Sequence, residues 1–148
     1  MQTLNNLLLR DAKPSDRPHL LLWDTPNEAD LEQITFYNYA QRISYRNNLL
    51  SRIDNKERFL VLHRYLDREL DAIRLICSQS SHSVVLLEGL DCLITYLYVQ
   101  PSTPITLLWQ KLSNMRHLES ILWILLPTKL APPNWTENRI INISTHLS

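Results

Sequence analysis

The stretch Ser83-Val84-Val85-Leu86-Leu87-Glu88-Gly89-Leu90-Asp91 is the strongest indication of the fold in this sequence. Its four consecutive apolar residues, two of them β-branched, predict a strand that is buried on both faces. The strand leads directly into an acidic residue, the one glycine of the chain and a helix-like segment. In open α/β sheets, ligands usually bind outside the carboxyl ends of such strands. We therefore expect an α/β fold with this segment as its central strand.

Other apolar runs predict the remaining strands of the sheet. Ile121–Leu126 is a second doubly buried strand, which Pro127 ends. Shorter runs at 19–23 and 43–46 predict two further strands, and the alternating residues 139–144 predict an edge strand.

Helical periodicity connects these strands. Asn27 is placed to cap a helix over residues 28–42, and Asp54 to cap a long one over 55–77. Thr103 followed by Pro104 predicts the start of another helix, and a short one is expected over 90–97. The long helix has one apolar stripe, with expected charge pairs Arg64–Asp67, Arg68–Asp71 and Asp71–Arg74 on its other side; the stripe is Phe59, Leu62, Leu66, Leu70, Ile73 and Ile76.

The alternation of strands and helices predicts the class of fold. It is typical of a mostly parallel sheet with helices on both faces, in three layers. We expect one domain over residues 18–148, preceded by an N-terminal arm and linker over 1–17. The arm carries Leu7, Leu8 and Leu9, which we expect to dock either on the domain or on a partner.

Composition narrows the function classes. The 148 residues carry no net charge, so a strongly basic nucleic-acid surface is not expected. Cys77 and Cys92 are expected to be buried free thiols in a reducing compartment. No signal peptide is visible, and the apolar runs are too short to span a membrane, so we expect a soluble intracellular protein without a membrane partner.

The single glycine excludes two common nucleotide sites. A phosphate-binding loop of the form GxxxxGK[ST] needs two glycines, and the dinucleotide fingerprint GxGxxG needs three. Neither motif is present in a chain with one glycine. We therefore expect no nucleotide cofactor bound in either standard way.

Three carboxylates follow predicted strands and are the candidates for site chemistry. Glu88 and Asp91 lie where an ATPase places the acidic group that holds magnesium-bound water, and Asp24 follows the first strand. The favoured alternative is structural, because carboxylates also stabilise helix N-termini. The histidines show no metal-ligand spacing, and no acid, base and nucleophile set is apparent, so we expect neither a metal nor an enzyme.

The four tryptophans differ in their expected positions. Trp23 and Trp123 lie in predicted strands and are expected in the core. Trp135 lies in a proline-rich loop, where an exposed indole would serve as an interface anchor. Trp135 and the arm's Leu7, Leu8 and Leu9 are therefore the interface candidates.

The order of elements resembles a RecA-type core that has lost its nucleotide loop. Residues 19–27 resemble a strand ending in an acidic residue, and 43–78 resemble a short strand plus the long helix upstream of the Walker B segment. Residues 84–97 resemble Walker B itself, with Glu88 at the acidic position, and 121–127 the next strand. The resemblance spans most of residues 19–144. With the Walker A segment missing, no catalytic residue carries over.

Small degenerate members of this kind occur among eukaryotic recombinase paralogues, notably as subunits of the Shu complex. The resemblance implies a nuclear, non-catalytic subunit that assists recombinase filaments in homologous recombination and DNA repair. Its expected partners are another RecA-like paralogue and a recombinase. Any DNA contact would be made through the complex, with candidate residues at Arg42, Arg46, Arg52, Lys56 and Arg58.

Two other functions stay open on the sequence. A RecA-like scaffold could belong to a different assembly, such as the Elongator ring that acts on transfer RNA. A small enzyme or ligand-binding domain could instead use Asp24, Glu88 and Asp91 at the carboxyl end of the sheet.

Overall fold

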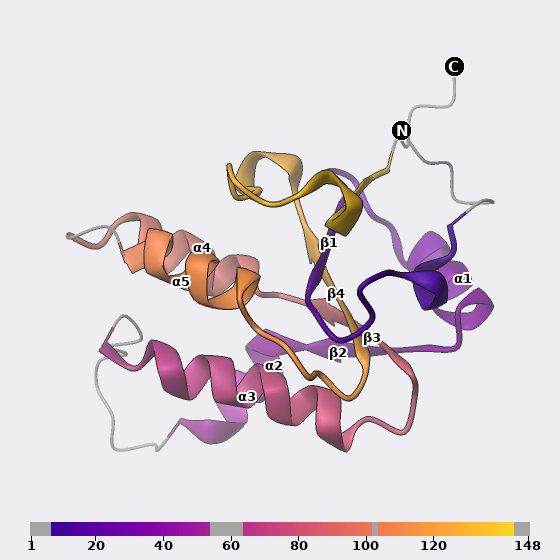
Figure 1. Ribbon diagram of the computed structural model, residues 1–148, viewed down its shortest axis with the longest axis horizontal. Helices are drawn as coiled ribbons and strands as arrows, with labels where there is room; N and C mark the ends of the chain where they lie inside the picture. Colours follow the sequence, from indigo (N-terminus) through magenta and orange to yellow (C-terminus); the bar gives the residue numbers. More distant parts are fainter. Residues whose placement is uncertain (1–6, 54–63, 102–103, 144–148) are drawn as a thin grey trace.

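Five strands form one sheet in the computed structural model, which describes residues 7–53, 64–101 and 104–143 (Figure 1). The strand order is β2-β3-β4-β1-β5, and every neighbouring pair is parallel. The α/β class with a parallel sheet is confirmed. The strands are β1 (His19–Leu22), β2 (Ala40–Ser44), β3 (Val84–Glu88), β4 (Ile121–Leu126) and β5 (Ile140–Asn142).

The two apolar runs that decided the fold lie side by side at the centre of the sheet. β3 pairs with β4 so that Val84 lies opposite Ile121 and Leu87 opposite Ile124. Successive residues of a strand point to opposite faces, and here they enter two separate cores. Val85 and Leu87 join one core, whereas Val84 and Leu86 join the other. Because both faces are covered, Val84–Leu87 of β3 and all of β4 are apolar.

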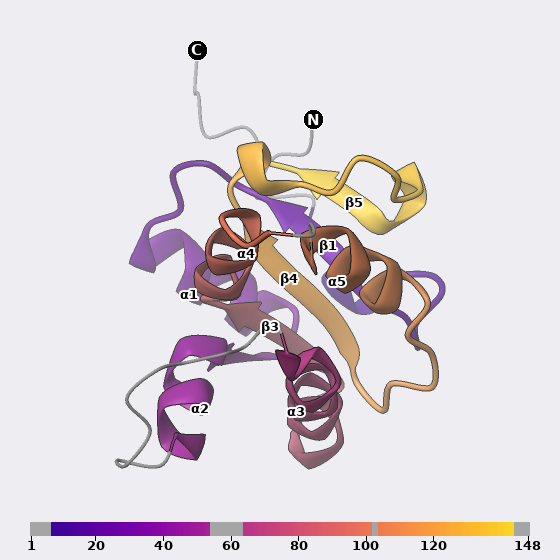
Figure 2. The ribbon, with the colours of Figure 1, turned by 90° about the vertical axis from the view of Figure 1, so that its left-hand side faces the viewer.

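The larger core lies between the sheet and four helices. Figures 1 and 2 show α3, α4 and α5 gathered on one side of the sheet, away from α1. Apolar residues from all four helices pack on this face. The helices are α2 (Tyr45–Arg52), α3 (Leu66–Gln79), α4 (Asp91–Tyr98) and α5 (Pro104–Ser113).

The smaller core lies on the other face, under α1 (Glu28–Tyr37) and the N-terminal arm. Leu7 and Leu9 of the arm are buried there with Trp123. The indole Nε1 of Trp123 donates to the carbonyl of Leu9 over 2.9 Å. The arm, which includes the short helix η2 (Leu9–Asp11), thus docks on its own sheet and completes the third layer.

The helix predicted over 28–42 is confirmed over residues 28–37 and wrong over 38–42. α1 ends at Tyr37, β2 occupies Ala40–Ser44, and α2 begins at once at Tyr45, so the strand predicted at 43–46 is also shifted. The Asn38 amide donates to the carbonyls of Ile34 and Leu7, which ends the helix and ties it to the arm. Tyr39 follows in the left-handed region with a φ of 51°.

The long helix starts later than predicted. α3 begins at Leu66, and its N-cap residue Tyr65 has non-helical backbone angles. The predicted start near 55, with Phe59 and Leu62, lies outside the described residues. The charge pairs expected along the helix also differ: the ion pairs found on α3 are Arg52–Glu69, Arg68–Glu69 and Lys111–Asp67.

Burial of the cysteines and tryptophans is confirmed in part. Cys77, Trp23 and Trp123 are buried. Cys92 is an exposed free thiol, contrary to expectation, because α4 turns Leu93, Ile94 and Leu97 toward the core instead. Among the helices of the described residues, none has the length and apolar character needed to cross a membrane.

Candidate functional site

The carboxyl ends of the central strands are where a ligand of this fold class would be expected. The chain leaves β1 for α1 on one face of the sheet, and leaves β3 and β4 toward the opposite face. Adjacent strands whose connections diverge in this way form a topological switch point, and ligands of open α/β sheets bind in the crevice there. The switch point of this sheet lies between β1 and β4.

A hydrogen bond from the chain itself spans this switch point. The backbone N–H of Thr128, which opens the short helix η4 (Thr128–Leu130), donates to Asp24 Oδ1 over 2.7 Å. Beside it, the N–H of Trp23 donates to the carbonyl of Leu126 over 2.9 Å. Asp24 therefore links the two diverging connections, and a carboxylate that accepts a helix N–H is in a stabilising position.

Glu88, at the end of β3, is held by a two-pronged contact with Arg42 of the neighbouring strand. Arg42 Nε lies 2.7 Å from Glu88 Oε2, and Arg42 Nη2 lies 3.0 Å from Oε1. The same guanidinium donates to both carboxylate oxygens of Glu28, over 2.9 and 3.0 Å. Such bidentate pairs are the stronger kind of ion pair. Glu88 thus has both oxygens engaged by its own chain.

The pKa values of this triad follow from the contacts. Hydrogen bonds to Glu88, and then to Glu28, raise the pKa of Arg42. The Arg42 guanidinium in turn lowers the pKa of the exposed Glu28 carboxyl. A magnesium ion at Glu88 would have to displace the Arg42 guanidinium, which already contacts both carboxylate oxygens. The triad Glu28–Arg42–Glu88 therefore locks three elements, α1, β2 and β3, at the carboxyl edge.

Gly89 explains how the turn after β3 lies so close to α2. Its φ is +84°, in the region that side-chain-bearing residues rarely adopt. A Cβ atom at this position would lie 3.3 Å from the backbone nitrogen of Arg46 and 3.4 Å from its Cβ. Asp91 follows as an exposed residue in the first turn of α4, where its charge suits the helix dipole.

The candidate DNA-contact arginines divide into two groups. Arg42 lies in the triad, and Arg52 donates to Glu69 through both Nη atoms, over 3.1 and 2.7 Å. Both are thus engaged with carboxylates of this chain, whereas Arg46 is exposed. Lys56 and Arg58 lie outside the described residues. A phosphate group would have to compete with these carboxylates for Arg42 and Arg52.

A buried carboxylate network was missed by the sequence reasoning. Glu69 of α3 is fully buried and accepts from the Tyr45 hydroxyl over 2.6 Å, as well as from Arg52 and Arg68. Burial raises the pKa of the Glu69 carboxyl, but the hydrogen bonds from Arg52 and Tyr45 outweigh it and the net shift is downward. The sequence indicated this network only by an acidic residue, Glu69, next to Leu70 of the apolar stripe.

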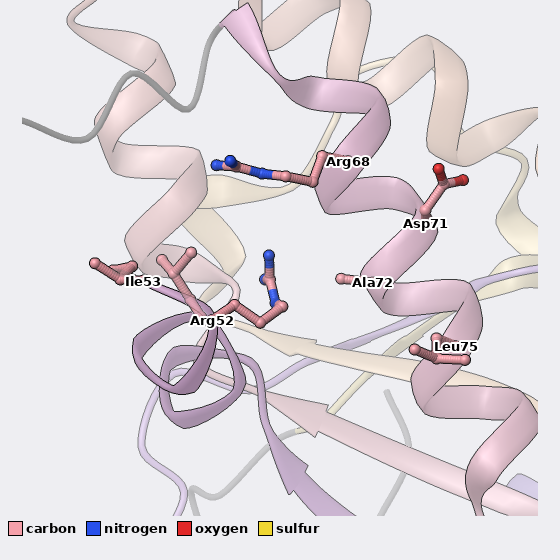
Figure 3. Close-up of a pocket in the computed structure, with 7 residues that line it drawn as sticks. Arg52, Ile53, Arg68, Asp71, Ala72 and Leu75 are labelled. Carbon is pink, nitrogen blue, oxygen red and sulfur yellow. The ribbon is translucent and has the colours of Figure 1, made fainter. Parts of the chain in front are cut away.

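The two arginines of this network border a cavity of about 250 Å³ between α2 and α3. Figure 3 shows Arg52 and Arg68 extending into it from the two helices. Ala72 and Leu75 form its apolar α3 wall, and Asp71 lies on its rim. The cavity therefore has an apolar wall and a charged rim. The guanidinium groups of this rim already form ion pairs with Glu69.

Most of the residues predicted as interface candidates are buried within the domain. Leu7 and Leu9 are core residues, while Leu8 is 44% exposed. The expectation that Trp135 is exposed is wrong, since it is only 8% exposed. Its ring packs edge-on against Trp109, with centroids 6.0 Å apart, and under the Arg139 guanidinium at 4.3 Å.

An exposed aromatic patch at the end of α1 is the surface that the sequence left unassigned. Phe36 is 84% exposed and Tyr39 is 68% exposed, and Tyr37 lies between them. The patch is next to β2, an edge strand that pairs with β3 on one side only within the described residues. A shallow cavity of about 330 Å³ adjoins it. The signal was the aromatic group at 36–39, which fits no single helical face.

Neither metal-ligating side chains among the described residues nor similar known proteins point to a function for this chain. Within the described ranges, no group of three or more His, Cys, Asp or Glu side chains is arranged to hold a metal ion. Comparison with protein-family models and with curated proteins found no match to this chain.

Proposed function

We propose that this protein is a non-catalytic, RecA-like subunit of a recombinase-paralogue complex of the Shu type. In this role it assists recombinase filaments in homologous recombination and DNA repair in the nucleus. The observation that carries the proposal is that Glu88 and Asp24, at the carboxyl edge of the sheet, are bonded to groups of their own chain. There the Glu28–Arg42–Glu88 triad ties α1, β2 and β3 together, and the Asp24–Thr128 hydrogen bond spans the switch point between β1 and β4.

The sequence and the edge geometry together favour a scaffold. The chain lacks both standard nucleotide loops, because it contains one glycine. The acidic residue at the Walker B position is neutralised by an arginine of its own sheet. A domain with these features keeps the layered architecture of its class and acts through contacts with other proteins.

The aromatic patch of Phe36, Tyr37 and Tyr39 is the proposed contact surface for the paralogue subunit. Aromatic residues are enriched at the centres of protein interfaces, and exposed ones next to an unpaired sheet edge are costly to leave in water. DNA contact, made within the complex, would involve Arg46, which is exposed next to the turn at Gly89.

Affinity purification of the tagged full chain from cells, followed by mass spectrometry, tests the proposal. We expect a RecA-like paralogue and a recombinase among the proteins recovered. The variant Phe36→Asp should lose the paralogue and sensitise cells to DNA breaks. The matched control Leu50→Asp places the same charge at another exposed apolar residue, which is 57% exposed on α2, and should retain both partners.

Two outcomes would contradict the proposed role. Recovery of an RNA-modifying assembly in place of recombination proteins would assign the chain to a different scaffold. A ligand or activity that is lost in Glu88→Gln, with the fold intact by circular dichroism, would indicate an enzyme or ligand-binding domain.

A further inference from the structure

Two neighbouring arginines, Arg17 and Arg139, carry an inference beyond the proposed function. Arg17 lies in the linker just before β1, and Arg139 ends the short helix η5 (Glu137–Arg139). Both guanidinium groups donate to the carbonyl oxygen of Ser113 at the end of α5, Arg17 from Nη2 and Arg139 from Nη1 over 3.3 Å. The shared acceptor places the two cations side by side. We call them the Arg17–Arg139 pair.

One member of the pair is taken almost completely out of water. Arg139 is only 3% exposed, and the Trp135 ring covers one face of its guanidinium at 4.3 Å. Its Nε donates to the carbonyl of Pro18 over 2.9 Å. Burial, and then the charge of Arg17, lower the pKa of Arg139 to about 10. A buried cation is costly unless an opposite charge compensates it.

No carboxylate among the described residues forms an ion pair with either arginine. Asp16, which precedes Arg17 in the chain, instead accepts the backbone N–H of His117 over 3.1 Å. The positive field of the pair reaches His19, whose pKa burial lowers most and the charges of Arg139 and Arg17 lower further. The surroundings of the pair are therefore positive, unlike those of Arg42 and Arg52.

The pair also carries hydrogen-bond donors that its own chain does not satisfy. Arg17 Nε and Arg139 Nη2 are buried and have no hydrogen-bond partner. The end of α5 explains in part why cations lie here, because a helix C-terminus is negative. Its Ser113 carbonyl, however, accepts only from Arg17 Nη2 and Arg139 Nη1. One donor on each guanidinium therefore remains for a negatively charged acceptor.

The chemistry and burial of these donors define the ligand. The edge of a guanidinium group matches the oxygens of a carboxylate or a phosphate. Arg17 is half-buried, and Asn138 next to Arg139 is exposed, so the pair lies close beneath the surface. The two unpaired nitrogens are themselves buried, so a ligand must be small to reach both. A free anion meets this condition better than the phosphate of a DNA backbone, which carries a sugar on each side.

We propose that the Arg17–Arg139 pair binds a small free oxyanion, to which Arg17 Nε and Arg139 Nη2 donate. The anion compensates both charges and joins the linker before β1 to η5, next to the end of α5. This inference does not rest on the proposed role in recombination.

Titration of the purified full chain with inorganic phosphate, and separately with acetate, tests this inference at constant ionic strength. Isothermal titration calorimetry should show one saturable site per chain. If the Kd is about 1 mM, phosphate at about 10 mM should raise the Tm by about 3–6 °C. Binding of phosphate alone would identify a phosphate-type ligand, and binding of acetate as well would extend the site to carboxylates. Chloride, which cannot offer two oxygens, should have little effect.

Substitution of each arginine assigns the binding to the pair. Arg17→Gln removes a half-buried member and should raise the Kd about tenfold or more, because a charged donor is lost. Arg10→Gln removes the same charge from an exposed position of the arm and should leave the Kd unchanged. Arg139→Gln should also abolish binding. Since Arg139 is buried, Arg17→Gln is the deciding variant if Arg139→Gln does not fold.

The inference is overturned if neither phosphate nor acetate shows saturable binding, or if chloride raises the Tm as much as they do. It is also overturned if Arg17→Gln and Arg10→Gln bind phosphate equally. Loss of the paralogue in Phe36→Asp, by contrast, tests only the proposed function. The two proposals can therefore fail separately.

Discussion

At the carboxyl edge of the sheet, Gly89 adopts a backbone conformation that residues with a side chain rarely adopt. Its φ of +84° lets the turn after β3 lie against the first turn of α2. Its neighbour Glu88 is thereby kept within reach of Arg42. A small change at this position therefore tests the architecture of the edge directly.

Gly89→Ala should lower the free energy of unfolding by about 1–3 kcal/mol, because it forces a positive φ on a residue with a Cβ and crowds the Arg46 backbone. Urea unfolding measures the effect. Thr95→Ala, at an exposed position of α4, should change stability by no more than about 0.5 kcal/mol. An unchanged midpoint in Gly89→Ala would show that the turn relaxes freely.

His19 gives the protein a pH dependence near neutrality. The ring is fully buried, stacks on Trp123 at 4.8 Å, and hydrogen-bonds through Nε2 to the Pro14 carbonyl over 2.8 Å. Burial lowers its pKa below the ordinary value of 6.5, and the charges of Arg139 and Arg17 lower it further, although the Pro14 contact opposes the shift. The folded chain therefore keeps this imidazole neutral where the unfolded chain protonates it.

The sign of the resulting pH effect is fixed by linkage. Below pH 6.5 the unfolded state binds the extra proton, so stability should fall as the pH is lowered from 6.5, by at most about 1.4 kcal/mol per pH unit. His19→Gln should be less stable at pH 7 but should show a flatter pH dependence over this window. Urea unfolding from pH 5 to 8 compares the two slopes, and parallel curves would exclude His19 as their cause.

At the scale of elements, the N-terminal arm is held by alternate residues. Leu9 and Leu7 are buried under the sheet, while Leu8 between them faces solvent. The backbone N–H of Leu9 donates to Asn38 Oδ1 over 2.8 Å, which binds the arm to the end of α1. The arm is therefore a structural layer of the domain.

Leu9→Ala should destabilise the protein by about 2–5 kcal/mol, because it leaves a cavity in a closed core. Leu8→Ala removes the same atoms from a 44% exposed side chain and should cost far less. Thermal unfolding of the two variants measures the difference. Equal losses would show that the arm does not dock in solution as it does here.

The Glu69 network joins α2 to α3 through one buried carboxylate. Glu69→Gln leaves Arg52 and the Tyr45 hydroxyl with an uncharged partner, and should cost about 3–5 kcal/mol, as expected when one member of a buried ion pair is removed. Because the pKa of Glu69 is lowered in the folded state, the native chain should lose this stability as the pH falls below 4.5.

The control for this network lies on the same helix. Asp71→Asn alters an exposed carboxylate on the rim of the cavity and should change stability by no more than about 0.5 kcal/mol. Urea unfolding at pH 7 and at pH 4 provides the measurement. If Glu69→Gln matches Asp71→Asn at pH 7, the network contributes nothing to stability.

At the scale of the whole molecule, one sheet serves two cores. Neighbouring residues on each central strand enter opposite layers, as Leu20 and Leu21 do on β1. Loss of either layer would expose half of every central strand to water. The two layers should therefore unfold as one cooperative unit.

This cooperativity can be measured with the native tryptophans. Trp23 and Trp123 report on the α1 side, and Trp109 and Trp135 on the α5 side. Variants that keep only one pair, with phenylalanine at the other two positions, should each show a fluorescence transition that coincides with the loss of helix by far-ultraviolet circular dichroism. Separate transitions for the two sides within one variant would mean that each layer unfolds independently.

The sequence by itself determined the centre of the fold. Val84–Leu87 and Ile121–Leu126 are apolar throughout because both of their faces are covered, and that pattern is sufficient to predict adjacent central strands with helices on either side. The single glycine likewise excludes the standard nucleotide loops.

Tertiary contacts decided the rest, because they depend on residues far apart in the chain. α1 ends at Tyr37 since Asn38 bonds to the arm, and Trp135 is buried since Trp109 and Arg139 cover it. Arg42 meets Glu88 only because β2 pairs beside β3. Local patterns fix which segments are buried, but the pairing of a charge with its partner across the sheet is set by the assembled fold.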